Sequence, residues 1–368
     1  MKNIKRQIII KNKVITVDLN KPAVRWAGNP ILTCHDVNKI WTDPKYQVIT
    51  VHNAGITRFE ENVIMLFRSH LRNGISVIGL ARSSDGLTDW KVQKKPAMIP
   101  CSEKDNFAAG KNINKLIENE AGGVEDPRIS KIGDTYFITY SAYHGSVKDR
   151  VRVSLATTKD FKTFIRHGEL LNVDMRNVVI FPEKINDKYH ALMRPNDDPS
   201  GPHTGGIFKE IRIARTSNIY SNIWEIEPKP VMKQGDVPSA FGDKIGPGAP
   251  PIKTKYGWLN IFHGVRSTMD GNPYVLGTAF HDLENPDNVK VSNIPVLFPS
   301  AADCNVSPED YVHVPQVVFT CGALRNKDGS ILIYYGGNDT VMNMAVSHED
   351  ILAALCKRYP QDPLSGIA

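Results

Sequence analysis

The residues best suited to chemistry in this chain are charged side chains that stand at equivalent ends of repeated strand pairs. Four of them end, or lie just beyond, the second strand of such a pair: Arg68, Arg194, His263 and Asp339. Others enter the first strand: Asn53, Asp126 with Arg128, and Arg176. A charge that leaves water without compensation costs free energy, so a purely structural protein has little reason to gather so many in one place. An anionic ligand among them would explain the pattern.

Five copies of one sequence unit carry these residues. Each copy has an apolar strand that ends near a small residue, then a polar turn and often an aromatic residue. The five phrases are IGLARSSDGLTDW, VSLATTKDFKTF, IRIARTSNIYSNIW, VLGTAFHDLENPDNV and MNMAVSHEDIL. Their equivalent alanines lie 75, 58, 65 and 66 residues apart, at Ala81, Ala156, Ala214, Ala279 and Ala345. Such a repeat is typical of a fold whose units hide their apolar faces against their neighbours.

A predicted β-hairpin precedes each phrase. The five hairpin segments are ITRFEENVIMLFRS, ISKIGDTYFITYSA, FPEKINDKYHALMRP, PIKTKYGWLNIFHG and GALRNKDGSILIYYGG, and each has turn-forming residues between two strand-forming runs. A hairpin, a third strand and a short outer strand make a four-stranded blade. Five blades closed into a ring leave a central channel, toward which the inner strands converge. This arrangement would bring the charged residues together.

The sequence therefore predicts an all-β fold, a five-bladed β-propeller in a single domain spanning 1–368. The blades are expected within about 46–355, with an N-terminal extension at 1–45 and a short C-terminal helix. Residues 102–120 have helical character and form a predicted insertion between the first two blades, as a pocket wall, an oligomer contact or a passive surface loop. A β-sandwich is the main alternative, but a sandwich does not need a repeat of 58 to 75 residues.

Composition and charge exclude several classes of protein. A content of 41% hydrophobic and 23% charged residues is typical of a soluble globular protein. The net charge of +6 is mild, and no run of Lys and Arg with interleaved aromatics suggests a nucleic acid partner. The five cysteines are widely spaced without a CxxC pattern, which argues against a disulfide framework and a zinc site. The only apolar run near the N-terminus, residues 8–10, is too short for a signal peptide, so we expect a cytoplasmic protein without a membrane partner.

The same residues carry a resemblance to a known family. Nine short motifs occur in order between Asn53 and Leu355: NAG, LFR, EDPR, RNVVIFPEKI, MRP, KIGPG, FHGV, PYVLG and YYGGND. Each motif alone is weak, but nine in order at equivalent blade positions are specific. In this respect the chain resembles the β-mannoside phosphorylases of glycoside hydrolase family 130, which are β-propellers. The resemblance implies inverting cleavage of a β-mannosidic bond by inorganic phosphate as co-substrate, with α-mannose 1-phosphate as product and no cofactor or metal.

The resemblance also implies a role for Asp126. In the family the Asp of the DPR motif is the general acid, and its proton reaches the glycosidic oxygen through the mannose 3-hydroxyl. Without the family context, an Asp before Pro and near Arg is more often a turn or salt-bridge residue.

The nucleophile distinguishes a phosphorylase from a hydrolase. An inverting hydrolase needs a second carboxylate to deprotonate water. Phosphate is already an anionic nucleophile, and the protein has only to bind and aim it with Arg, Lys and His side chains. The family's phosphate-binding positions match Arg176, Arg194, Lys244, His263 and Tyr274. Each of these residues alone would more often be a surface, ion-pair or packing residue.

The sugar-binding positions of the family match Asn53, Arg68 and Asp339, which are expected to grip the mannose unit to be transferred, and Arg128 of the DPR motif is added to this set. Asp303, Asp310 and Tyr311 lie near the start of the last blade without a motif to assign them. Homo-oligomers are frequent in the family, so an oligomer contact through the first 45 residues is a further expectation.

One position departs from the best-defined subgroups. Those enzymes, which act on mannosyl-glucose or on 1,4-linked mannosides, carry Tyr before the DPR motif, whereas this chain has Glu125. The departure favours members that act on β-1,2-linked mannosides. Glu125 is also a candidate to raise the pKa of Asp126 by like charge, or to mark a hydrolytic member with an unusual base. A β-mannosidase and a non-catalytic glycan-binding propeller thus remain as alternatives, and the acceptor sugar stays open.

Overall fold

The computed structural model describes residues 4–148, 150–196, 210–235, 239–269 and 271–367. In this part of the chain nearly all regular structure is β. The helical elements are few: α1 (Cys34–Asn38), α2 (Ile113–Glu120), α3 (Glu349–Arg358), and the 3-10 turns η1 (Pro44–Tyr46) and η2 (Ala301–Asp303). The predicted all-β fold and the short helix near the C-terminus are both present. None of these helices is both long and apolar enough to cross a membrane.

The first half of the chain forms two antiparallel meanders. The first contains β4 (His52–Phe59), β5 (Asn62–His70), β6 (Ser76–Ser83) and β7 (Lys91–Val92). The second contains β9 (Gly123–Ile132), β10 (Thr135–Tyr143), β11 (Val151–Thr158) and β12 (Ile165–Glu169), and the short β8 (Asn106–Phe107) pairs in parallel with β12. A single parallel pairing, Ser76 with Gly123, joins the two meanders into one nine-stranded sheet.

Three further sheets follow along the chain. The next has β13 (Met175–Ile180), β14 (Tyr189–Pro195), β15 (Arg212–Thr216) and β16 (Glu225–Ile226). The sheet after it has β17 (Lys244–Pro247), β18 (Ile252–Thr254), β19 (Gly257–Val265), β20 (Tyr274–His281), β21 (Val289–Ser292) and β25 (Pro360–Gln361). The last has β22 (Val318–Arg325), β23 (Ser330–Gly337), β24 (Val341–His348) and β3 (Val24–Arg25), while β1 (Lys5–Ile10) and β2 (Lys13–Asp18) pair only with each other.

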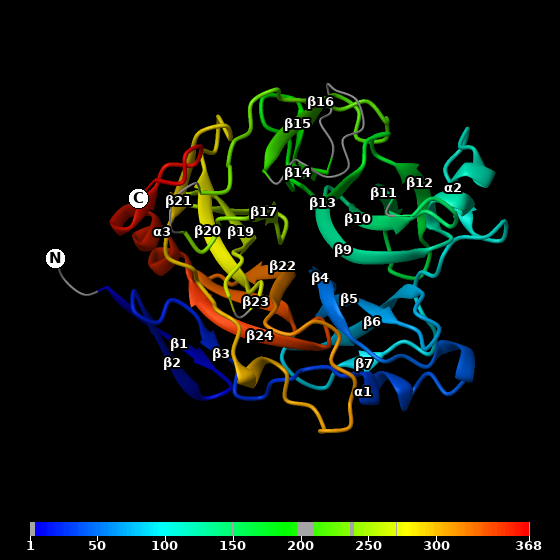
Figure 1. Ribbon diagram of the computed structural model, residues 1–368, viewed down its shortest axis with the longest axis horizontal. Helices are drawn as coiled ribbons and strands as arrows, with labels where there is room; N and C mark the ends of the chain where they lie inside the picture. The colour runs from blue at the N-terminus through cyan, green and yellow to red at the C-terminus, as the bar shows by residue number, and fades with distance from the viewer. Residues whose placement is uncertain (1–3, 149, 197–209, 236–238, 270, 368) are drawn as a thin grey trace.

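The sheets stand around a common centre, with β4, β9, β13, β17 and β22 innermost (Figure 1). Apolar cores lie between neighbouring sheets. On β5, for example, Met65 and Phe67 pack toward the last sheet, and Ile64 and Leu66 pack toward the β9 meander. The middle strands β19, β23 and β24 are consequently buried along their whole length. Alternate side chains of a middle strand serve two different cores, and each sheet thereby holds both its neighbours in place.

The hairpin turns have the predicted chemistry. Glu60 turns β4 into β5, Gly133 turns β9 into β10, and Gly329 turns β22 into β23, all with positive φ. Asn186 and Asp187 do the same before β14. Gly, Asn and Asp accept the left-handed backbone that tight hairpins require more readily than other residues. Four of the five predicted hairpins are therefore found at their turn residues. In the third, residues 181–185 form no strand, and the partner of β14 is the preceding segment β13.

The segment before the first meander contributes a strand to the last sheet. Its strand β3 pairs with β24, through Arg25 with Ala345 and Val24 with Val346. The Arg25 guanidinium also binds the buried Asp303, at 2.7 Å from Nε to Oδ1. Residues 1–45 were expected to lie outside the repeats, but β3 supplies the outer strand of the last sheet.

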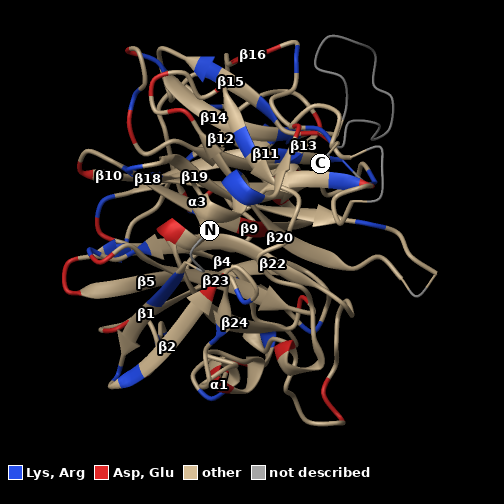
Figure 2. Ribbon diagram, turned by 90° about the vertical axis from the view of Figure 1, so that its left-hand side faces the viewer, with Lys and Arg blue, Asp and Glu red and all other residues tan. Residues whose placement is uncertain are grey.

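The inserted helix α2 is fixed by a buried ion pair. Glu120 at its end accepts from Arg166 NH1 at 2.5 Å and from the Tyr140 hydroxyl at 2.6 Å. Both partners belong to the β9 meander, so the insertion is tied to the face of that meander. Around the outside of the molecule, basic and acidic segments are interspersed (Figure 2), in keeping with the mild net charge.

Candidate active site

The inner strands carry irregular backbone at equivalent points. Asn53 on β4, Asp126 on β9 and Asn177 on β13 have φ of 49°, 51° and 58°. At each of them the register with the neighbouring strand shifts, as in a β-bulge. A bulge redirects a side chain that would otherwise follow the alternation of the strand, and Asn and Asp tolerate the left-handed conformation best among residues with a side chain. Three successive inner strands thus have a bulge with a left-handed Asn or Asp near the centre of the ring.

One side of the centre contains a closed network of charges. Arg68 donates to Asp126 Oδ1 at 3.1 Å and to Glu125 Oε1 at 2.7 Å. Asn53 Nδ2 donates to Asp126 Oδ1 at 3.1 Å and to Asp339 Oδ1 at 3.2 Å. Segments distant in the sequence supply these groups: β4, β5, β9 and the turn after β23. The structure therefore brings together Asn53, Arg68, Asp126 and Asp339, as the sequence predicted.

The two aspartates of this network have opposite pKa shifts. Burial pushes the pKa of Asp126 up, but the positive charges of Arg68 and Arg128 and the hydrogen bonds from Asn53 and Arg68 outweigh burial, so its pKa lies below the usual value. Burial raises the pKa of Asp339 to about 6, with only partial compensation from Arg68. In the ligand-free protein Asp126 is thus a carboxylate, and Asp339 is the group that holds a proton in weak acid.

The Arg128 side chain is more deeply buried than expected for a residue that only contacts a sugar. Its side chain is buried, and its three nitrogens each donate to a neutral oxygen: Nε to Gly248 O at 2.9 Å, NH1 to Asp126 O at 2.8 Å, and NH2 to Asn177 Oδ1 at 2.9 Å. These bonds join β9 to β13 and to the segment after β17. Arg128 therefore fixes the backbone at Asp126 and brings a positive charge close to it.

The other side of the centre collects cations. Arg176 and Arg194 are paired directly across β13 and β14, so their side chains leave the same face. Burial, followed by the charge of Arg176, lowers the pKa of Arg194 to about 10, and its Nε finds no hydrogen-bond partner among the described residues. The Arg176 guanidinium stacks over Tyr143, 5.3 Å from the ring centroid. Within the described ranges, no carboxylate pairs with Arg176 or Arg194.

Lys244, His263 and Tyr274 continue this cationic side. The Lys244 amine lies 4.7 Å from the centroid of the Tyr274 ring, and the Tyr274 and His263 rings stack at 6.0 Å. His263 is fully buried, and neither of its ring nitrogens has a partner in the part of the chain that the structure describes. Burial, then the charges of Arg194 and Lys244, keep the pKa of His263 well below its usual value, so the imidazole is neutral. All five predicted phosphate-binding residues therefore lie on this side.

Two motif glycines allow the close approach of these side chains. A Cβ on Gly246, in KIGPG, would stand 2.6 Å from Cε1 of His263. A Cβ on Gly336, in YYGGND, would stand 2.4 Å from Oδ1 of Asn53. Real Cβ atoms do not come so close to other atoms, so either substitution would displace a site residue.

Comparison with known proteins is consistent with this geometry. The family model described as beta-1,4-mannooligosaccharide phosphorylase, glycoside hydrolase family 130, matches residues 22–358. The chain belongs to glycoside hydrolase family 130. The matched range includes every predicted site residue and begins just before β3, the outer strand of the last sheet of this family 130 chain.

Individual relatives support the assignment. The chain is 34% identical over 274 residues to the 1,2-beta-oligomannan phosphorylase of Thermoanaerobacter sp. strain X514, covering 74% of this chain and 78% of the relative. It is 32% identical to the beta-1,4-mannooligosaccharide phosphorylase of Ruminococcus albus over 95% of this chain and 99% of the relative. The solved beta-1,2-mannobiose phosphorylase of Listeria innocua, in complex with beta-1,2-mannobiose, superposes with a TM-score of 0.73 at 26% identity, over 91% and 99% of the two chains. The fold is therefore of the β-propeller type found in family 130.

Several residues of this family 130 site were not predicted from the sequence. Asn177 holds Arg128, Ser76 donates to Glu125 at 2.6 Å, and His70 Nε2 lies 3.0 Å from Arg68 NH2. The RNVV motif did contain Asn177, and its place directly after Arg176 in a bulge-forming strand was an available signal. His70 lies two residues after Arg68 on the same face of β5, which was also an available signal, whereas the proximity of Ser76 depends on how the strands pair.

The structure also shows the partners of the acidic residues that no motif assigned. Asp303 is a buried structural partner of Arg25 and of the Tyr335 hydroxyl, and Asp310 pairs with His35. Glu125 binds Arg68 and Ser76, and the pKa of Asp126 is lowered rather than raised. The suggestion that Glu125 keeps Asp126 protonated is therefore wrong, because Arg68 stands between the two carboxylates and interacts with both.

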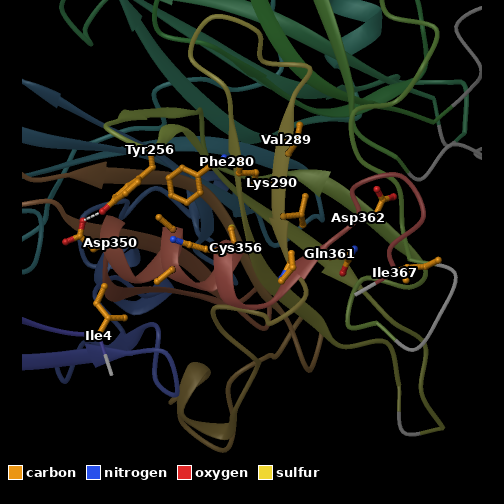
Figure 3. A pocket seen from close by; sticks show the side chains of 15 residues that line it. Ile4, Tyr256, Phe280, Val289, Lys290, Asp350, Cys356, Gln361, Asp362 and Ile367 are labelled. Atoms are coloured by element: carbon orange, nitrogen blue, oxygen red, sulfur yellow. Dashed lines mark hydrogen bonds between the residues drawn. The ribbon is translucent and has the colours of Figure 1, made fainter. Parts of the chain in front are cut away.

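A separate hollow of about 870 Å³ lies at the outside of the ring, between α3 and the strands β20, β21 and β25 (Figure 3). Its wall is mainly apolar, and its Asp350 accepts from the Tyr256 hydroxyl at 2.7 Å and forms ion pairs with Arg6 at 2.6 Å and Lys255 at 2.9 Å. None of the site residues lines it. Within the described ranges, no cluster of three or more His, Cys, Asp or Glu side chains is arranged to hold a metal ion.

Proposed function

We propose that this protein catalyses the reversible, inverting phosphorolysis of β-mannosides, forming α-mannose 1-phosphate. The observation that carries the proposal is the cationic side of the centre, where Arg176, Arg194, Lys244 and the neutral His263 lie together without a described carboxylate partner for either arginine. The like charges of Arg176 and Arg194 disfavour each other, and a bound anion would relieve this repulsion. Arg forks and an ammonium group are the usual ligands of phosphate in proteins.

The two sides of the centre suggest how the reaction runs. Asn53, Arg68 and Asp339 would hold the mannose unit through paired hydrogen bonds to its hydroxyls. Phosphate, held by the cationic side, attacks the anomeric carbon from the α face. The bond from that carbon to the leaving oxygen breaks, and a bond to a phosphate oxygen forms with inversion. The leaving oxygen takes a proton that originates on Asp126 and passes through the mannose 3-hydroxyl.

The proton balance requires Asp126 to change state during the cycle. In the ligand-free protein its lowered pKa makes it a carboxylate. A carboxylate is the form needed in the synthetic direction, in which the acid becomes the base that removes a proton from the acceptor hydroxyl. In phosphorolysis, Asp126 has to gain a proton as the sugar replaces its bonds to Arg68 and Asn53. Both directions therefore use one residue.

The hydrolase alternative finds less support. An inverting hydrolase places its second carboxylate across the sugar from the acid, commonly 6.5–9.5 Å away. Glu125 is the neighbour of Asp126 in sequence and shares Arg68 with it, so it stands beside the acid and not opposite. For the linkage, we propose β-1,2, because Glu125 replaces the Tyr of the 1,4-acting subgroups and a β-1,2 phosphorylase is among the relatives.

The finer features of the chain belong to the same proposal. We infer that the antiparallel meanders are the five blades of one propeller domain, with the segment before β4 as an extension that closes the ring through β3. The enzyme would act as a glycosyltransferase-type phosphorylase, with phosphate as co-substrate and no organic cofactor. A charged sugar phosphate does not cross a membrane readily, so a cytoplasmic location would retain the product. Homo-oligomerisation stays a prediction.

The test is to incubate the purified protein with β-1,2-mannobiose, with and without inorganic phosphate, and to follow mannose 1-phosphate by phosphorus NMR and free mannose by proton NMR. Phosphate-dependent appearance of α-mannose 1-phosphate is the expected result. Free mannose at equal rates in both samples would replace the phosphorylase with a hydrolase. If neither product forms, β-1,4-mannobiose in the same assay separates a wrong linkage from a protein that only binds glycans.

A further inference from the structure

A group of aromatic side chains flanks the carboxylate network on the side of the last sheet. The residues are Tyr311 and His313, in the connection that leads into β22, and His70 at the end of β5. The Tyr311 hydroxyl lies 2.7 Å from Nδ1 of His313. The His313 and His70 rings are 4.5 Å apart, and His70 Nε2 lies 3.0 Å from Arg68 NH2. A continuous chain of contacts therefore runs from Tyr311 to the guanidinium that binds Asp126.

The exposed fraction of the side chain falls along this series of contacts, from Tyr311 to His70. Tyr311 has 48% of its surface exposed, His313 is half-buried, and His70 is 8% exposed. An exposed tyrosine whose hydroxyl is tied to a histidine has its ring held in one orientation. The group thus forms a wall that leads from solvent to the network.

The connection that carries Tyr311 is fixed at both ends. Asp310 accepts from His35 Nε2 at 2.9 Å, which attaches the connection to α1. On the other side, the backbone N–H of His313 donates to Thr340 Oγ1 at 3.0 Å, and that of Val314 donates to Asn338 O at 3.1 Å. Asn338 and Thr340 flank Asp339. The aromatic wall is thereby set at a defined distance from the proposed mannose contact.

The chemistry of this wall differs from that of the cationic side. Arg68 accepts no proton, so His70 Nε2 has to be the acceptor of the Arg68 N–H, which requires a neutral imidazole. Burial, followed by the charge of Arg68, lowers the pKa values of His70 and His313, that of His70 to about 3. Neutral rings with hydrogen-bonding edges suit an uncharged sugar and offer little to phosphate.

We propose that Tyr311 and His313, supported by His70, form the platform for the acceptor sugar, the part of the β-mannoside that leaves with the glycosidic oxygen. The proposal rests on the phosphorylase function. An inverting displacement places the nucleophile and the leaving group on opposite faces of the mannose. With phosphate on the side of β13, β14 and β17, the leaving sugar lies toward β5 and the connection before β22. With Nδ1 of His313 in contact with Tyr311, its Nε2 remains for a sugar hydroxyl.

The test compares Tyr311→Ala with the wild-type protein in the synthetic direction, with α-mannose 1-phosphate as donor and mannose as acceptor. Loss of a ring that stacks on a sugar should raise the KM for mannose roughly 5- to 30-fold, while the KM for phosphate in phosphorolysis stays within about twofold. Tyr311→Phe keeps the ring and should recover most of the affinity. Tyr220→Ala is the matched control, because Tyr220 is 47% exposed and lies against Phe137 and His167, away from the site.

An unchanged KM for mannose in Tyr311→Ala, or an equal rise in the KM for phosphate, would overturn the platform. A circular dichroism melt of each variant verifies that it is folded. The wild-type protein tests the underlying function separately: if it forms no mannose 1-phosphate from either mannobiose, the phosphorylase assignment fails. If it forms the product and Tyr311→Ala has wild-type kinetics, only the platform fails.

Discussion

The buried charged groups on the two sides of the centre have different kinds of partner. On the side of β4, β5 and β9, Arg68 is shared by Glu125 and Asp126, and Asn53 joins the two aspartates. On the side of β13, β14 and β17, the arginines and Lys244 lie among aromatic rings and one another, and the pKa of Arg194 is lowered to about 10. On the first side the charged groups are paired with one another, whereas on the second side neither arginine has a carboxylate partner among the described residues.

Under the proposed function the two sides bind different substrates, the sugar on the first side and phosphate on the second. A sugar has to compete for hydrogen bonds that Arg68 and Asn53 already make, so its binding exchanges one set of bonds for another of similar kind. An anion meets donors that repel one another and relieves that repulsion. Phosphate binding should therefore stabilise the fold more than binding of the sugar does.

The largest expected effect comes from the carboxylate side. Asp126→Asn keeps the shape of the side chain and the hydrogen-bond acceptor toward Arg68, but it cannot transfer a proton. We expect kcat for phosphorolysis to fall by about 100- to 10,000-fold, which is the usual contribution of a general acid. The Kd for β-1,2-mannobiose, measured by calorimetry, should change little. Undiminished turnover in this variant would show that the proton comes from elsewhere.

A second variant tests the cationic side. Arg194→Met removes a charge and retains much of the side-chain volume, so the KM for phosphate should rise roughly 10- to 100-fold, as expected for lost charge-assisted hydrogen bonds. Because the charged form of Arg194 is disfavoured by burial and by Arg176, the variant should melt higher than the wild type without phosphate. The melting temperature should then respond less to added phosphate.

The control for that experiment is Arg358→Met, at the exposed end of α3, which should leave both the KM and the melting temperature unchanged. If Arg194→Met melts lower than the wild type in phosphate-free buffer, the cations are not in mutual repulsion, and the contrast between the two sides disappears.

The smallest expected effect concerns Asp339. Its pKa is raised to about 6 in the folded protein, above the unfolded value near 4, so the folded state binds the proton more tightly. Its contribution to stability is present at pH 4 and is lost as the pH rises through 6. Asp339→Asn should therefore be more stable than the wild type at pH 7, by on the order of 1–3 kcal/mol, and equally stable near pH 4. Urea unfolding at the two pH values measures the difference, and a variant less stable at pH 7 would contradict the pKa shift.

The positions of the site residues could be predicted from the sequence, whereas the pairing of β3 with β24 could not. Asn53, Arg68, Asp126 and Asp339 were placed together because equivalent ends of inner hairpins must converge, and the hydrogen bonds among them confirm that they do. The pairing of β3 with β24 has no such repeat signal, because a two-residue strand carries no periodicity. His313 was missed for a related reason, since its contact with His70 depends on where a long connection lies.

The pairing of β3 with β24 has a consequence for the order in which the protein folds. Arg25 and its partner Asp303 are 278 residues apart in sequence, so the last sheet lacks its outer strand and a buried ion pair until both ends of the chain are present. Contacts of such long range form late, and until then β24 presents an open edge that other chains can pair with. Removal of the first 30 residues would therefore leave a chain with all its proposed catalytic groups but with an unpaired β24 edge that is prone to aggregate.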